Sequence, residues 1–99
     1  MRNRLVVIGD LTDEIKIKEE NGIPVAEFVL QVEKNDYEIE FIPLKDFRSI
    51  AVDLAKEVKK GMKVYIRGRV EACGYEKDSN KNRSIELVVK TFEVVGERL

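Results

Sequence analysis

The sequence predicts an all-β fold, a barrel of five strands with one short helix between the third and fourth. Apolar and polar residues alternate over most of the chain, which is the period of a β-strand. Only residues 50–58 change to helical spacing. The 99 residues are enough for one domain with a single core. A β-sandwich requires more strands and a ferredoxin-like fold a second helix, so a small barrel fits best.

The first two strands are predicted from alternation and from the turn between them. Residues 4–9, RLVVIG, are rich in β-branched side chains, and the strand continues or restarts at residues 15–18, where isoleucine alternates with lysine. Asn21-Gly22 favours the positive backbone angles of a tight hairpin. The second strand follows at residues 24–32. Its core side is predicted to carry Ala26, Phe28, Leu30 and Val32.

The third predicted strand, residues 38–47 (EIEFIPLKDF), has two different faces. Ile42 and Leu44 form an ordinary core face. The opposite face carries Phe41 and Phe47 with Lys45 between them. Aromatic rings offer nucleobases a stacking surface, and the cation can pair with phosphate. The alternative is a strand buried on both faces, with both phenylalanines in the core.

One helix and two strands complete the predicted barrel. Apolar residues recur through 50–58, Ser49 is the expected N-cap, and Gly61 suits the left-handed turn that follows. Residues 62–75 alternate again, and Gly68 among them indicates a sharp bend or a close backbone approach. Residues 84–95 form the last strand, with inward side chains expected at Ile85, Leu87 and Val89. This order of elements is that of a five-stranded Greek-key barrel of the OB type, as a single domain over residues 1–99.

The composition argues against catalysis and against a metal site. The chain has no histidine, and the single cysteine, Cys73, excludes an internal disulfide and a cysteine-based metal site. We therefore expect no enzyme activity, no cofactor and no metal. No apolar run approaches a membrane span or a signal peptide, so a cytoplasmic protein is expected. The net charge of −1 is unlike that of most nucleic-acid-binding domains, which are basic. A locally basic groove can nevertheless bind phosphates on a protein whose total charge is near zero.

Four segments, in order, resemble the bacterial single-stranded DNA-binding proteins and the related primosomal replication protein N group. They are NRLVVIG, NGIPVAEFVLQV, FIPLKDFRSIAVDLAKEVKKG and VYIRGRVEACGY, and the likeness covers residues 3 to about 95. The resemblance implies sequence-independent binding of single-stranded DNA in replication, repair or recombination. It also implies a homodimer or homotetramer, association with the nucleoid and contacts with replication or repair proteins. The residues do not distinguish DNA from RNA.

The resemblance also implies a set of binding residues. Bases would stack on Phe41, Phe47 and Tyr75. The predicted backbone contacts come from the cations Lys45, Arg48, Arg67, Arg69, Lys77, Lys81 and Arg83. The alternative for each cation is ordinary solvated surface charge.

Several residues depart from the family pattern. Glu71 and Cys73 stand where the family often has basic residues, the loop at residues 33–37 is short, and tryptophan is absent. The Gly/Pro/Gln-rich linker and acidic tip by which typical members recruit partners do not follow Leu99, so such a tail is either naturally absent or removed. The near-neutral charge and Glu71 favour the second hypothesis, a tail-less OB module for protein interaction, a primosome or replisome adaptor with weak nucleic-acid affinity.

Overall fold

The computed structural model describes residues 3–73 and 84–97, and they form six strands and one helix. In chain order these are β1 Leu5–Leu11, β2 Lys16–Glu20, β3 Ile23–Glu33, β4 Ile39–Phe47, α1 Arg48–Glu57, β5 Met62–Cys73 and β6 Ser84–Glu97.

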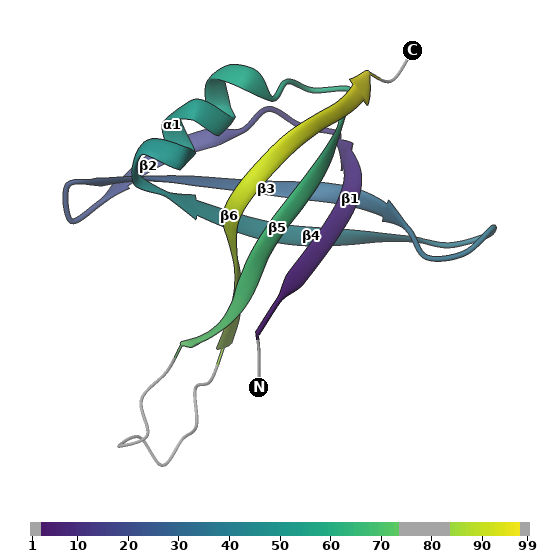
Figure 1. The fold of residues 1–99 in the computed structure, drawn as a ribbon, viewed down its shortest axis with the longest axis horizontal. Helices are drawn as coiled ribbons and strands as arrows, with labels where there is room; N and C mark the ends of the chain where they lie inside the picture. The colour runs from purple at the N-terminus through teal and green to yellow at the C-terminus, as the bar shows by residue number, and fades with distance from the viewer. Residues whose placement is uncertain (1–2, 74–83, 98–99) are drawn as a thin grey trace.

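The strands close into a five-stranded barrel, which confirms the predicted OB-type fold. The sheet order is β1-β5-β6-β4-β3, and β1 returns to pair with β3. The first predicted strand is divided into β1 and β2, and β2 pairs along β3. The backbone pairing between β4 and β6 is parallel and consists of one residue pair, Lys45 with Val88. Figure 1 shows β6, β5 and β1 side by side in front, with the β3–β4 hairpin crossing behind them.

Two glycines act as the sequence predicts. Asn21 and Gly22 both have positive φ, 55° and 78°, which is the backbone of the expected tight hairpin between β2 and β3. At Gly68, a Cβ atom would lie 2.0 Å from the carbonyl oxygen of Val88 on β6. Only a glycine therefore allows β5 and β6 to approach this closely.

The core lies inside the barrel and beneath α1. The predicted inward residues of β3 to β5 are buried or partly buried, and α1 buries Ala51 and Leu54. Ser49 is not the N-cap: the helix begins at Arg48, Phe47 holds the cap position, and no side chain bonds the cap.

The expectation that Ile85 points into the core is wrong, since the residue is 69% exposed. The physical reason is the closure of the barrel. Because the backbone of β4 pairs with β6 only at Val88, the backbone of the preceding part of β6 runs past the closed region and pairs with β5 alone. Val89, by contrast, is 3% exposed and joins the core.

Candidate nucleic-acid interface

The outer face of the β3–β4 hairpin carries the two predicted stacking residues of β4. Phe41 lies opposite Gln31 and is 59% exposed, and Phe47 lies opposite Val25 and is partly buried. At ~3.3 Å per residue, the two positions are about 20 Å apart along the strand. Phe41 therefore offers an open ring surface, whereas Phe47 offers only part of one.

Lys45, between these rings, is surrounded by carboxylates. Its ammonium nitrogen lies 2.7 Å from a carboxylate oxygen of Glu86, 3.7 Å from Glu27 and 3.8 Å from Glu20. The hydrogen bond to Glu86 raises the pKa of Lys45, against the opposing effect of burial. The lysine is thus charged, but its charge is already compensated, and a phosphate would have to compete with Glu86 for it.

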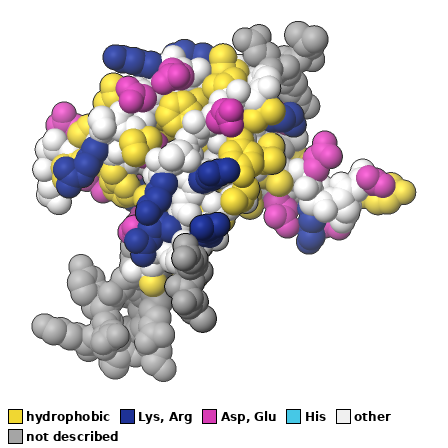
Figure 2. Space-filling model, viewed as in Figure 1, with side chains coloured by type: hydrophobic (Ala, Val, Ile, Leu, Met, Phe, Trp, Pro, Cys, Tyr) yellow, Lys and Arg dark blue, Asp and Glu magenta, His cyan; other side chains and the backbone are white. Residues whose placement is uncertain are grey.

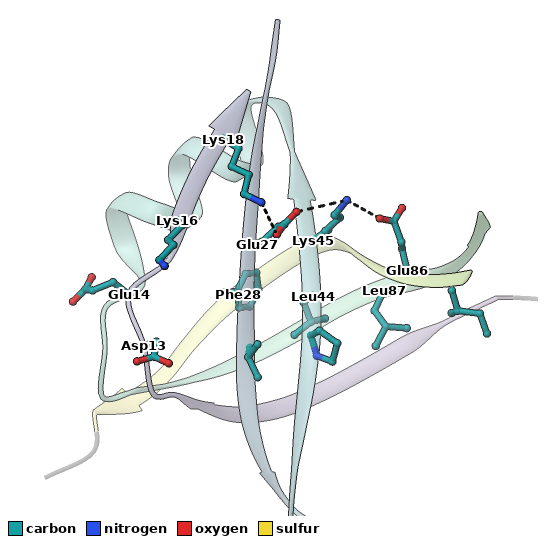
Figure 3. Close-up of a pocket in the computed structure, with 13 residues that line it drawn as sticks. Asp13, Glu14, Lys16, Lys18, Glu27, Phe28, Leu44, Lys45, Glu86 and Leu87 are labelled. Carbon is teal, nitrogen blue, oxygen red and sulfur yellow. Dashed lines mark hydrogen bonds and ion pairs between the residues drawn. The ribbon is translucent and has the colours of Figure 1, made fainter. Parts of the chain in front are cut away.

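An open groove with a volume of about 880 Å³ lies between the β3–β4 hairpin, β2 and the start of β6. Figure 3 shows its rim, where Lys18, Glu27, Lys45 and Glu86 form a chain of ion pairs above Phe28, Leu44 and Leu87. We call it the acidic groove, because its charged lining has four carboxylates and three lysines: Asp13, Glu14, Glu27, Glu86, Lys16, Lys18 and Lys45. Its own field does not favour a phosphate backbone.

The other described candidates do not join Phe41 and Phe47 on the hairpin face. Arg48 is exposed at the start of α1, with φ of 63°. Arg67 and Arg69 lie on β5, which pairs with β1 and β6. Arg69 forms a 3.7 Å ion pair with Glu71, and both side chains are about half exposed. The predictions for Tyr75, Lys77, Lys81 and Arg83 lie outside the described residues.

A second groove, about 620 Å³ in volume, lies on β1, β5 and β6. Among the described residues, its charged lining consists of Arg4, Arg67 and Lys90, with no carboxylate, and we call it the basic groove. Figure 2 shows Lys and Arg side chains gathered over these strands. Arg4 and Lys90 were not predicted as site residues, although strand alternation places both on the outer side of their strands.

A buried carboxyl group adjoins Phe47 in sequence. Asp46 is 1% exposed, and its Oδ1 accepts a hydrogen bond from the Phe47 N–H at 2.8 Å. Its Oδ2 has no hydrogen-bond partner among the described residues. Burial raises the pKa of Asp46 to about 7, against the lowering effect of the backbone hydrogen bond. This group therefore titrates near neutrality at the junction of β4 and α1.

Membrane-spanning helices and metal-ligand clusters are both absent from the described residues. No helix there is long and apolar enough to cross a membrane. Nor does any set of three or more His, Cys, Asp or Glu side chains in residues 3–73 and 84–97 come together as metal ligands would.

Comparison with known proteins agrees with the fold. The model of the single-strand binding protein family matches residues 2–95. The single-stranded DNA-binding protein 4 of Streptococcus agalactiae is 32% identical over 106 aligned residues, which cover 99% of this chain and 77% of the relative. The single-stranded DNA-binding protein of Clostridium tetani is 33% identical over 94, covering 88% of this chain and 65% of that protein. This chain belongs to the single-strand binding protein family.

Proposed function

We propose that the protein binds single-stranded DNA without sequence preference, in replication, repair or recombination. The observation that carries the proposal is the exposed ring of Phe41 on the outer face of β4, in a chain of the single-strand binding protein family. Family membership does not favour the alternative of a protein-interaction adaptor. Kinship with the primosomal replication protein N group stays a prediction.

Binding on this surface depends on stacking more than on charge. A base stacked on an aromatic ring contributes ~1–3 kcal/mol and tolerates every base. Phe41 and Phe47, about 20 Å apart, contact bases separated along the strand, and a third stack on Tyr75 is part of the proposal. Lys45 reaches a phosphate only when its contact with Glu86 is exchanged. The proposed backbone contacts also include Arg48, Arg67, Arg69, Lys77, Lys81 and Arg83.

The protein acts by occupying exposed strand, with no bond chemistry. A homodimer or homotetramer is part of the proposal, and β1 supports it. Val6 and Ile8 are 55% and 48% exposed on this strand. β1 pairs with β3 only at Asp10 and Leu11, so among the described residues the edge of residues 5–9 opposite β5 has no partner strand. A second copy can add its own β1 there. Contacts with replication or repair proteins remain a further part of the proposal.

Fluorescence-anisotropy titration of labelled oligothymidylates tests this function. Phe41→Ala is expected to weaken binding by ~1–3 kcal/mol, with little change in the salt dependence, because it removes a stack and no charge. The matched control is Val95→Ala, which truncates an apolar side chain of similar exposure on β6. It is expected to bind like the wild type. Absence of binding by the wild type at low salt would falsify the proposal.

A further inference from the structure

Gln31 lies directly opposite the exposed ring of Phe41. The antiparallel register of β3 and β4 pairs these two residues. Side chains of directly opposite residues share one face of the sheet, and their Cβ atoms are about 4.5–5.5 Å apart. Phe41 is 59% exposed, and Gln31 is partly buried beside it. The amide of Gln31 therefore lies next to the surface on which a base would stack.

Gln31 differs in chemistry from the rest of this outer face. The residues that alternation places on the face are Val25, Glu27, Val29, Gln31 and Glu33 on β3, and Ile39, Phe41, Pro43, Lys45 and Phe47 on β4. Of these, only Gln31 has a side chain that is uncharged and can hydrogen-bond. On these two strands, a neutral donor and acceptor for the base on Phe41 can therefore come only from Gln31.

The amide of Gln31 is available to a ligand. On its other side Gln31 pairs with Asp10 of β1, whose carboxylate Oδ1 lies 3.4 Å from the ammonium nitrogen of Lys63. Within the described residues, the Gln31 side chain makes no hydrogen bond, to Asp10 or to any other group. Its amide atoms are not among the buried polar atoms without a partner, so solvent satisfies them.

A glutamine amide can match the edge of every base. Its oxygen accepts a hydrogen bond and its NH₂ group donates. Each base carries a donor beside an acceptor on its Watson–Crick edge, for example N3–H beside O4 in thymine and the N4 amino group beside N3 in cytosine. A half-turn of the amide exchanges its donor and acceptor, so the same side chain fits either order. Such a contact adds affinity without selecting a base.

We propose that Gln31 contacts the edge of the base stacked on Phe41 and keeps this contact independent of base identity. A base in an offset stack on the ring has one edge within reach of the amide. The inference rests on the proposed function and adds a polar contact to it, made from β3 rather than β4. A carboxylate at the same position could only accept, and it would make the protein choose among bases.

Gln31→Glu tests the proposal through the ratio of affinities for oligodeoxycytidylate and oligothymidylate. Labelled oligomers of about 12 nucleotides stay within the ~4–16 nucleotides that one OB fold covers. The carboxylate accepts from the cytosine amino group but faces the O4 acceptor of thymine. The ratio is expected to rise about 5-fold or more over that of the wild type in anisotropy titrations at pH 8. The added negative charge acts on both backbones alike and cancels in the ratio.

Two further variants separate the hydrogen bond from charge and from folding. Gln31→Met keeps the length of the side chain without its polar groups, and it is expected to weaken binding of both oligomers by about 3- to 10-fold with the ratio unchanged. Val95→Glu, at an exposed position on β6, adds the same charge away from the hairpin and should leave the ratio as in the wild type. Urea denaturation should show all three variants folded at the titration conditions.

Combination with Phe41→Ala tests whether both residues contact the same base. The ratio shift caused by Gln31→Glu is expected to disappear in the double variant, because no base is then held beside position 31. A shift that persists without the ring overturns the pairing of Gln31 with Phe41.

The outcomes distinguish this proposal from the function on which it rests. If the wild type binds both oligomers and Phe41→Ala weakens both, but Gln31→Glu leaves the ratio unchanged, the function stands and the role of Gln31 fails. Binding by Gln31→Met equal to that of the wild type has the same meaning. If the wild type binds neither oligomer at low salt, both fail.

Discussion

The two grooves of this small barrel carry opposite charge, although each is lined by three cationic side chains. In the acidic groove, four carboxylates line the same walls, and Lys18 and Lys45 are held by them. In the basic groove, no carboxylate lines the wall within the described residues. The number of cationic side chains in a groove therefore does not tell how many are available to a ligand. The net charge of −1 does not reveal the different local charge of the two grooves.

The largest effect is expected at Gly68, whose backbone sits against β6 beside a bulge at Lys90. Gly68→Ala places a methyl group 2.0 Å from the Val88 carbonyl oxygen, so the strands must separate. We expect a loss of more than ~3 kcal/mol of unfolding free energy, measured by urea denaturation. Gly96→Ala, where nothing lies within 4 Å, is the control and should change stability by less than ~1 kcal/mol. Similar stabilities for the two variants would contradict the close approach.

Asp46→Asn tests whether the buried carboxyl group next to Phe47 in sequence affects the stability of the fold. Burial raises the pKa of Asp46 from 3.8 to about 7. The folded chain therefore keeps a proton that the unfolded chain releases, and stability from this group falls as pH rises from about 4 to about 7. Urea denaturation should show the asparagine variant ~1–3 kcal/mol more stable at pH 8 and nearly equal to wild type at pH 4. A gap that does not vary with pH would contradict the raised pKa.

Glu86→Gln makes the acidic groove more like the basic one. The substitution removes the carboxylate nearest to Lys45, at 2.7 Å, and keeps a side chain of the same size. We expect tighter binding of oligothymidylate by about 1 kcal/mol and a salt slope steeper by ~0.7, because one more cation can contact a phosphate. Glu93→Gln, on the same strand, is the control for loss of one negative charge. Equal gains from both variants would indicate a general charge effect.

The smallest effect is expected at Arg48, which lies outside both linings. Its φ of 63° is a left-handed conformation that disfavours a side chain by ~1–2 kcal/mol. Glycine relieves this strain but adds freedom to the unfolded chain, so Arg48→Gly should stabilise by up to ~1 kcal/mol in thermal unfolding. Arg48→Lys keeps the charge and the strain and should match the wild type in stability. A less stable glycine variant would mean that the arginine side chain has a structural role.

The fold was largely predictable because strand alternation reports burial directly. The faces of β4 follow from it: Leu44 is buried and Phe41 is exposed, as the pattern indicates. Gly68 and the Asn21-Gly22 turn were also predictable from the sequence. Gly68 allows a close approach of two strands, and the turn requires positive φ angles. The exposure of Ile85 was not predictable from alternation. It depends on where the backbone of β4 pairs with β6, and this pairing joins distant parts of the chain.

The charge of the site was less predictable than its shape. Alternation places Lys45 on the same face as Phe41 and Phe47, but it does not reveal that Glu20, Glu27 and Glu86 converge on it. Those carboxylates come from three strands, and only the registers between strands bring them together. Arg4, Arg67 and Lys90 are likewise far apart in sequence and meet only through pairing with β5 and the bulge in β6.

The single residue pair between β4 and β6 gives the barrel a seam. Neighbouring strands joined by so few backbone hydrogen bonds separate at a lower free energy than the whole domain unfolds. When this seam opens at Lys45 and Val88, the β3–β4 hairpin, paired over nine residues, and the β1–β5–β6 sheet stay joined by the β1–β3 pairs at Asp10 and Leu11. Backbone amides along this seam are therefore expected to exchange their hydrogens with solvent before those of the long antiparallel ladders do. The β4–β6 pairing is thus the place where we expect the barrel to open first.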